Sequence, residues 1–128
     1  RLSARLGNRV HFKREDLQPV FSFKLRGAYN RISRLTEDER RRGVVAFSSG
    51  NHAQGVAYAC RHFGAKGTIF MPVTTPKQKI DKTKVFGGDA IEIVLKGDYF
   101  DQTLAAAQAF CASLALRTAA STSSASTA

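Results

Sequence analysis

The chain has 128 residues and a formal net charge of +10. That length suits one modest domain or part of a larger one, and its apolar runs are far shorter than the roughly 20 residues that cross a bilayer. Without a membrane segment or a secretory-signal pattern, a cytoplasmic location is expected. A strong positive charge is typical of nucleic-acid binders, but only residues 40–42 form a basic cluster and no aromatic residues alternate with the basic ones, so nucleic acid is not an expected partner.

The first third of the chain predicts a strand, a loop and two helices. Residues 10–12 alternate between apolar and polar, which favours a short strand, and residues 15–22 contain a proline and favour a loop. Apolar residues recur at helical spacing over 23–35. Residues 36–42 begin with a capping-box pattern and predict a second, short helix.

Three strand–helix units follow. The expected strands cover 44–47, 68–71 and 90–94, and the expected helices cover 52–63, 76–86 and 99–111. Apolar strands that alternate with helices predict an α/β fold, with an open parallel sheet and helices on both faces. Right-handed crossovers bring the carboxyl ends of such strands to one edge, where ligands bind. The turns over 48–55 and 71–75 belong to this edge.

Residues 112–128 differ from the rest of the chain because they are nearly all Ala, Ser and Thr. No strand or turn pattern follows residue 111. We therefore expect the last helix to end in this segment and to run into a disordered tail. The chain divides into a partial domain over 1–111 and this tail over 112–128.

Lys24 is the first candidate for chemistry. It lies at the predicted start of a helix, which Ser22 or the backbone at Phe23 can cap. The positive potential at a helix N-terminus disfavours an ammonium group, and a neutral amine is the form of lysine that makes Schiff bases. The alternative is a solvated surface lysine.

The turn after residue 47 is the second candidate. Between a strand and a helix, the N–H groups of such a turn point outward and attract an anion such as a carboxylate. Ser48 and Ser49 add hydroxyl donors, and Gly50 permits a tight turn. Asn51 can cap the helix and can also offer its amide to a ring oxygen. The alternative is an ordinary helix cap formed by Asn51.

Histidines supply a third set of candidates. His52 lies in the first turn of a predicted helix and suits either acid–base chemistry or a positioning role; the absence of a nearby carboxylate in the sequence favours positioning. No metal site is expected, because His11, His52 and His62 lack ligand spacing and the chain has no Cys-x-x-Cys pair.

Several motifs together resemble the threonine dehydratase (threonine ammonia-lyase) family of fold-type-II pyridoxal-phosphate enzymes, which includes serine dehydratase and serine racemase. The resemblance extends over roughly residues 2–111. Its main motifs are KREDLQ at 13–18, SFKLRGA at 22–28 and SGNHAQG at 49–55, and shorter matches follow at 70–72, 75–76 and 86–88. It implies the small domain and part of the large domain of such an enzyme, and pyridoxal 5′-phosphate as cofactor.

The resemblance implies a role for each candidate residue. Lys24 matches the lysine that binds the cofactor covalently and removes the substrate Cα proton, Phe23 packs near the cofactor ring, and Asn51 bonds its 3′ oxygen. The substrate carboxylate is held, mostly by backbone N–H groups, in the loop formed by Ser48, Ser49, Gly50, Asn51, His52 and Ala53.

The implied reaction removes water from L-threonine or L-serine and gives a 2-oxo acid and ammonia; with threonine it begins isoleucine biosynthesis. The partner is a small amino acid, and the whole enzyme is expected to be a homo-oligomer. Ser49 departs from the dehydratase pattern, in which alanine is common. It resembles serine racemase, in which this hydroxyl is a second acid–base catalyst. A racemase-like enzyme is therefore the alternative.

The resemblance also indicates what the chain lacks. The family's glycine-rich loop for the cofactor phosphate and the polar residue that faces the pyridine nitrogen are expected beyond the end of this chain, and some N-terminal residues are expected to be missing. Truncation or a shifted reading frame would explain the tail. We expect a fragment that keeps the lysine and the carboxylate loop but holds the phosphate poorly, so a catalytically incompetent fragment is a further hypothesis.

Overall fold

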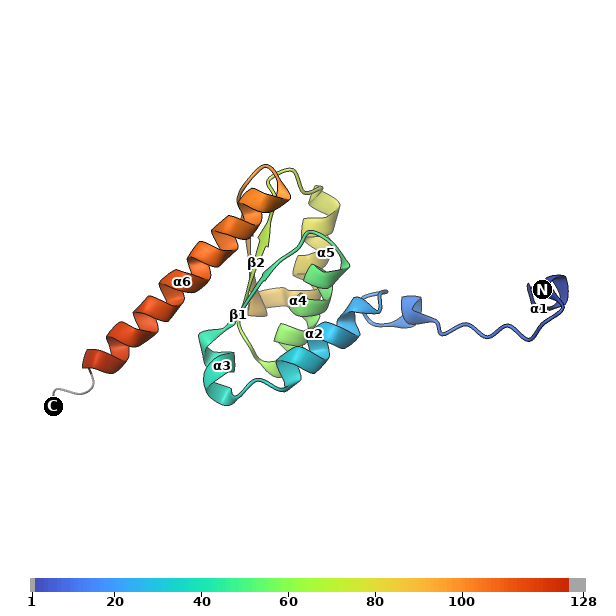
Figure 1. Cartoon of the computed structure of the whole chain (residues 1–128), viewed down its shortest axis with the longest axis horizontal. Helices are drawn as coiled ribbons and strands as arrows, with labels where there is room; N and C mark the ends of the chain where they lie inside the picture. The colour runs from blue at the N-terminus through green and yellow to red at the C-terminus, as the bar shows by residue number, and fades with distance from the viewer. Residues whose placement is uncertain (1, 125–128) are drawn as a thin grey trace.

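The computed structural model describes residues 2–124 (Figure 1). Its α-helices are α1 (Leu2–Leu6), α2 (Lys24–Ser33), α3 (Glu37–Arg42), α4 (Asn51–Phe63), α5 (Lys77–Gly87) and α6 (Phe100–Ser124). Its strands are β1 (Val44–Phe47), β2 (Gly67–Met71) and β3 (Ile91–Leu95), and two short 3₁₀ turns are η1 (Glu15–Leu17) and η2 (Gly88–Ala90).

The three strands form one parallel sheet in the order β1-β2-β3. Val44 pairs with Gly67, and Gly67 pairs with Ile91, so the strands begin in line and their carboxyl ends meet at one edge. Helices α4 and α5 lie on one side of the sheet and α6 lies on the other, while α2 packs on α4 (Figure 1). The predicted open parallel sheet with helices on both faces is therefore confirmed.

The core lies between α4 and the central strand β2. Ile69 and Met71 of β2 are completely buried, and so are Ala53, Ala57 and Ala59 of α4. Small alanine side chains let α4 approach the sheet closely, and interiors of this kind are packed as densely as crystals. The turn that precedes α4 is consequently held at a fixed place on the sheet edge.

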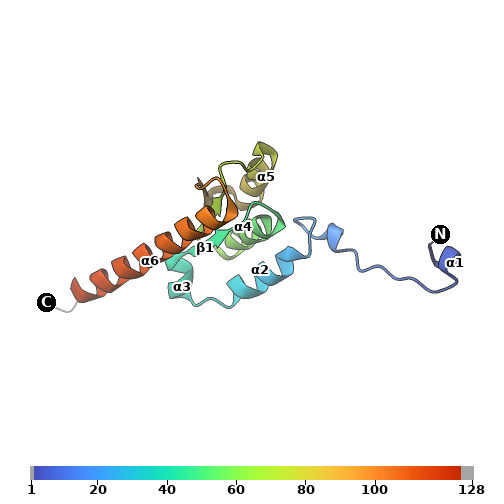
Figure 2. The same ribbon diagram turned by 45° about the horizontal axis from the view of Figure 1, so that its top comes forward.

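The predicted strand at residues 10–12 is wrong. This segment is extended but forms no ladder, because no strand in the described part of the chain lies beside it to exchange hydrogen bonds. Both views show residues 8–14 leading away from the body toward α1 (Figures 1 and 2). Apolar alternation fits a strand, but a strand also needs a neighbour.

Two helix ends also differ from the expectation. Helix α5 begins at Lys77 with Pro76 as its N-cap, not with the expected Thr75 cap, and the Thr75 hydroxyl is buried with no hydrogen-bond partner in the described residues. Helix α6 runs past Cys111 to Ser124, in line with the high helix propensity of alanine. Of the expected disordered tail, residues 125–128 lie outside the described residues.

Helix α3 begins with the predicted capping box. The Thr36 hydroxyl accepts a hydrogen bond from the Glu39 N–H at 3.3 Å, and the Thr36 N–H donates to Glu39 Oε2 at 2.8 Å. We predict that Thr36→Ala lowers the free energy of unfolding by about 1 kcal/mol, measured by urea unfolding. The control is Thr74→Ala, which removes one exposed hydrogen bond to the Asp98 carbonyl. Equal losses in the two variants would contradict the capping role.

Candidate active site

The lysine of the SFKLRGA motif is the first residue of α2. Ser22 is buried, and its hydroxyl accepts a hydrogen bond from the Lys24 N–H at 3.3 Å. The residue at the N-cap position is Phe23, which makes no side-chain cap. The helix therefore begins within one residue of the predicted start, and the Lys24 side chain leaves from its first turn. The amine lies 5.2 Å from the centre of the exposed Phe23 ring.

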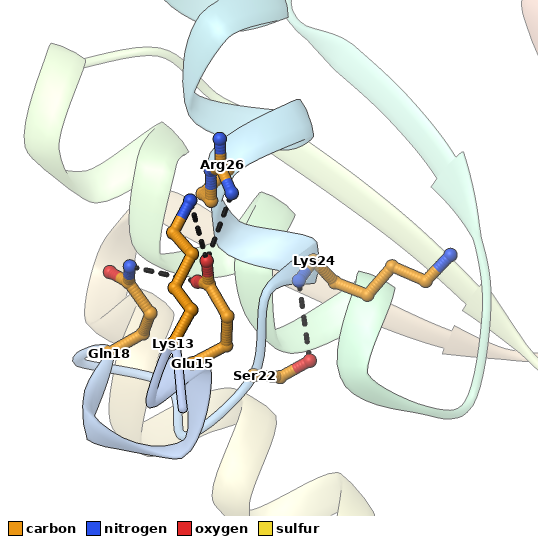
Figure 3. A network of polar contacts seen from close by, with 6 residues as sticks. All are labelled: Lys13, Glu15, Gln18, Ser22, Lys24 and Arg26. Atoms are coloured by element: carbon orange, nitrogen blue, oxygen red, sulfur yellow. Dashed lines mark hydrogen bonds and ion pairs between the residues drawn. The ribbon is translucent and has the colours of Figure 1, made fainter. Parts of the chain in front are cut away.

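Helix α2 packs against α4 through its apolar face. Leu25, Ala28 and Ile32 are buried on this face, at the spacing expected of an amphipathic helix. Lys24 is on the exposed side of the first turn. Figure 3 shows its side chain extended away from Glu15 and across the segment between β1 and α4.

An open cleft of about 660 Å³ joins the start of α2 to the start of α4. Its lining residues are Phe23, Lys24, Arg26, Gly27, Ala28, Asn30 and His52. The structure thus brings Lys24 and His52 to one cavity, although 28 positions separate them in the sequence. This cavity has the size of an ordinary small-molecule site.

Glu15 is engaged elsewhere and leaves the Lys24 amine free (Figure 3). Its Oε1 lies 2.9 Å from Arg26 Nη1 and 3.3 Å from Lys13 Nζ, and Gln18 Nε2 donates to its Oε2 at 3.1 Å. Desolvation disfavours the Glu15 carboxylate, but these hydrogen bonds outweigh it and lower its pKa. The Lys24 amine forms no ion pair with any residue that the structure describes.

The turn after β1 offers free N–H groups. The Ser48 N–H donates to the Phe70 carbonyl at 3.0 Å, and the Gly50 N–H donates to the Ser48 hydroxyl at 3.3 Å, so these two groups are occupied. The N–H groups of Asn51, His52 and Ala53 have no partner within the described chain, as expected in the first turn of a helix. They form a donor set for an anion.

Two expectations about this turn are corrected. Gly50, not Asn51, is the N-cap of α4, and Asn51 is the first helical residue. The Asn51 amide is therefore exposed and makes no hydrogen bond to the described residues, which leaves it available to a ligand. Gly50 has φ −124°, which any residue adopts, and a Cβ there would meet nothing within 4 Å. Its conformational freedom is not needed for the turn.

The other residues of the loop contribute in different ways. Ser48, Ser49 and Gly50 are half-buried beside the cleft without lining it, and the Ser49 hydroxyl has no hydrogen bond to the described residues. Ala53 is completely buried, so only its N–H group can serve a ligand. Among the predicted site residues, the cleft itself brings together Phe23, Lys24 and His52.

Sequence reasoning missed Arg26 and Asn30, which also line the cleft. They lie four positions apart on one face of α2, and this polar i,i+4 pair was the available signal. Gln54 was missed as well. It is almost completely buried beside the turn, and its side-chain oxygen has no hydrogen-bond partner in the described part of the chain.

The ionisation of His52 reports its surroundings. Desolvation by the surrounding chain lowers the pKa of His52, and the positive charge of Lys24 lowers it further. The neutral imidazole is therefore favoured at neutral pH. Among residues 2–124 we find no group of three His, Cys, Asp or Glu side chains that could hold a metal, and no helix with the length and apolar character of a bilayer span.

The fold and the cleft define a class of protein, an α/β protein with an open cleft at the carboxyl edge of a parallel sheet. A family model described as pyridoxal-phosphate dependent enzyme matches residues 1–125. The chain therefore belongs to the family of pyridoxal-phosphate dependent enzymes.

Individual members of this family that are similar to the chain include threonine dehydratases and a serine racemase. The chain is 50% identical over 111 residues to the biosynthetic L-threonine dehydratase IlvA of Bacillus subtilis. This match covers 87% of this chain and 26% of that protein. Threonine deaminase isoform 2 of Solanum lycopersicum superimposes with a TM-score of 0.74 at 52% identity, over 80% of this chain and 27% of the other. Maize serine racemase superimposes with a TM-score of 0.77 at 33% sequence identity, over 84% of this chain and 32% of the other. The chain spans about a quarter of the length of the curated relatives it matches.

The electrostatic link between Lys24 and His52 is testable. We predict that Lys24→Gln raises the pKa of His52 toward its ordinary value of 6.5, but only in part, because desolvation is the larger cause of the shift. The measurement is a pH titration of the imidazole proton signals by NMR. Lys13→Gln is the control, because Lys13 pairs with Glu15 and should leave His52 unaffected. An unchanged pKa of His52 in the Lys24→Gln variant would show that the Lys24 amine does not reach this cavity.

Proposed function

We propose that the chain is the part of a threonine dehydratase that supplies the cofactor lysine and the substrate-carboxylate loop. One observation carries this proposal: the Lys24 amine, which has no ion-pair partner among the described residues, shares a cleft with His52 in the first turn of α4. A nucleophilic amine next to an anion-binding turn suits an amino-acid substrate better than a nucleic acid.

The described residues fit pyridoxal 5′-phosphate in part. Lys24 offers an amine without a carboxylate partner, Phe23 offers an exposed ring beside it, and Asn51 offers an uncommitted amide for a ring oxygen. When bound, this cofactor supplies an aldehyde to which a lysine amine can attach and a ring that accepts negative charge from the substrate. We assign no described residue to its phosphate, in keeping with a chain that spans a quarter of its relatives.

The chain's own residues would then divide the work. The N–H groups of Asn51, His52 and Ala53 bind the substrate carboxylate and orient the amino acid. The Lys24 amine, fixed at the start of α2, removes the Cα proton, and its fixed position replaces a bimolecular encounter by an intramolecular one. His52 is favoured in its neutral form by desolvation and by Lys24, so it positions the loop without adding positive charge.

The overall reaction converts L-threonine into 2-oxobutanoate and ammonia, because the water lost with the β-hydroxyl is regained on hydrolysis of the product. L-Serine would give pyruvate in the same way. The word "biosynthetic" in the name of the Bacillus subtilis relative supports a place at the start of isoleucine synthesis. A homo-oligomeric whole enzyme, a cytoplasmic location and the division of the chain at residue 111 stay predictions.

A chimera tests the function directly. The matched 111 residues of the Bacillus subtilis enzyme are replaced by those of this chain, and 2-oxobutanoate formation from L-threonine is measured. We expect an active chimera, and a loss of kcat on the order of a thousandfold or more in Lys24→Ala. The control is Lys66→Ala, at the opposite end of the sheet. The 128-residue chain alone should give no turnover. A folded but inactive chimera, or an active Lys24→Ala variant, would contradict the proposal.

The racemase-like alternative is favoured by one observation: the Ser49 hydroxyl makes no hydrogen bond to the residues that the structure describes. We expect dehydratase chemistry, so Ser49→Ala in the chimera should change 2-oxobutanoate formation by less than about tenfold, and neither form should convert L-serine into D-serine. Chiral chromatography measures both products. D-serine formation that disappears in Ser49→Ala would establish the alternative. Racemisation needs a second acid–base group on the side of the substrate opposite Lys24, and this hydroxyl would be that group.

A further inference from the structure

The first turn of α2 contacts α4 at Gly55. A Cβ built on Gly55 would lie 3.2 Å from the Lys24 carbonyl oxygen and 3.2 Å from both the N and the Cα of Leu25. These are main-chain atoms, which cannot rotate aside as a side chain can. Gly55 lies inside α4, where every residue can adopt the backbone conformation. Space, rather than conformation, is therefore what this position requires of a glycine.

Gly55 shares a face of α4 with the turn residues. It follows Asn51 by four positions and precedes His62 by seven, so all three lie on the stripe that faces α2. At the far end of this stripe the Tyr29 hydroxyl lies 3.0 Å from His62 Nε2, and the Tyr29 and Phe63 ring centres are 4.6 Å apart. Helix α2 is thus fixed on α4 at two points.

We propose that Gly55 is a positioning residue for Lys24. The missing side chain lets the main chain at Lys24 touch α4 one turn below Asn51, and this contact sets the reach of the amine toward His52 and the free N–H groups. The Tyr29–His62 contact fixes the angle of α2 at the other point. The inference rests on the proposed function, since it assigns Gly55 a role in the reaction of Lys24.

Any side chain at Gly55 must displace α2 by a few tenths of an ångström, because the three facing atoms belong to its backbone. The displacement moves the root of the Lys24 side chain relative to the turn. Reactions between groups held in place depend steeply on such geometry, and a shift of about 1 Å costs roughly a hundredfold in rate. A methyl group should therefore reduce the reaction of Lys24 without unfolding the chain.

The test uses the intact chain and pyridoxal 5′-phosphate as the probe. The lysine nitrogen attacks the aldehyde carbon, water leaves, and borohydride hydride fixes the product as a secondary amine. Mass spectrometry then gives the ratio of labelled Lys24 to labelled Lys66, an exposed lysine at the amino end of β2. We expect a preference for Lys24 in the original chain and a ratio about tenfold lower in Gly55→Ala. The control, Ile69→Val, weakens the core at β2 and should leave the ratio unchanged.

The outcomes separate the two proposals. A chain that shows no preference for Lys24 would overturn the role of Gly55, while the chimera and its Lys24→Ala variant decide the proposed function. A preference that persists in Gly55→Ala would overturn the positioning role alone. If circular dichroism shows Gly55→Ala to be unfolded, Tyr29→Phe decides, because it removes the hydroxyl contact with His62 and keeps the ring. We expect its ratio to fall about threefold, and an unchanged ratio would overturn the inference.

Discussion

The contact between α2 and α4 is the constraint on which the site depends. Helix α2 carries the Lys24 amine and α4 carries the free N–H groups, so neither helix forms the site alone. Helix α4 is fixed to the sheet by completely buried alanines, and α2 packs mainly on α4. The sheet consequently places the lysine indirectly, through one intermediate helix. The position of the Lys24 amine is therefore only as well defined as the packing of α2 on α4.

Electrostatics act in the same direction as packing. The acidic groups near the start of α2 are engaged with guanidinium groups, since Glu15 binds Arg26 and Asp16 binds Arg14. The Lys24 charge and the first-turn N–H groups of α4 are left without an anion from the described chain. A cleft lined by positive potential concentrates small anions. The net charge of +10 would by composition alone indicate nucleic-acid binding, but part of it lies on Lys24 and Arg26, which line the cleft.

Much of the fold was predictable because it depends on local patterns. Apolar runs and helical spacing gave the three strands and the helices between them, and Thr36 and Glu39 gave a cap whose two hydrogen bonds involve only neighbours. The prediction of a strand at residues 10–12 failed for the opposite reason. A strand depends on a neighbouring strand, and the apolar periodicity of one segment does not reveal whether there is one. The start of α5 was missed by one residue because Pro76 takes the cap position itself.

The site was predictable only as far as its motifs. Lys24 and the turn were found from residue type and position, but their meeting in one cleft is a tertiary fact. Asn51 was expected as the cap, whereas Gly50 takes that place and leaves the amide uncommitted. Gly55 closes the SGNHAQG motif, but the motif does not reveal why a glycine is needed there, because the requirement comes from the backbone of another helix.

The extended segment over residues 8–14 has a practical consequence for work with the protein. Its main chain has no ladder partner among the described residues, and Phe12 presents 68% of its surface to water. Leu17 and Phe21, further along the chain, are similarly exposed. Open backbone edges and uncovered apolar rings favour contacts between molecules. We therefore expect the chain to aggregate when it is purified at high concentration. Low concentrations and a solubilising fusion partner should reduce this aggregation.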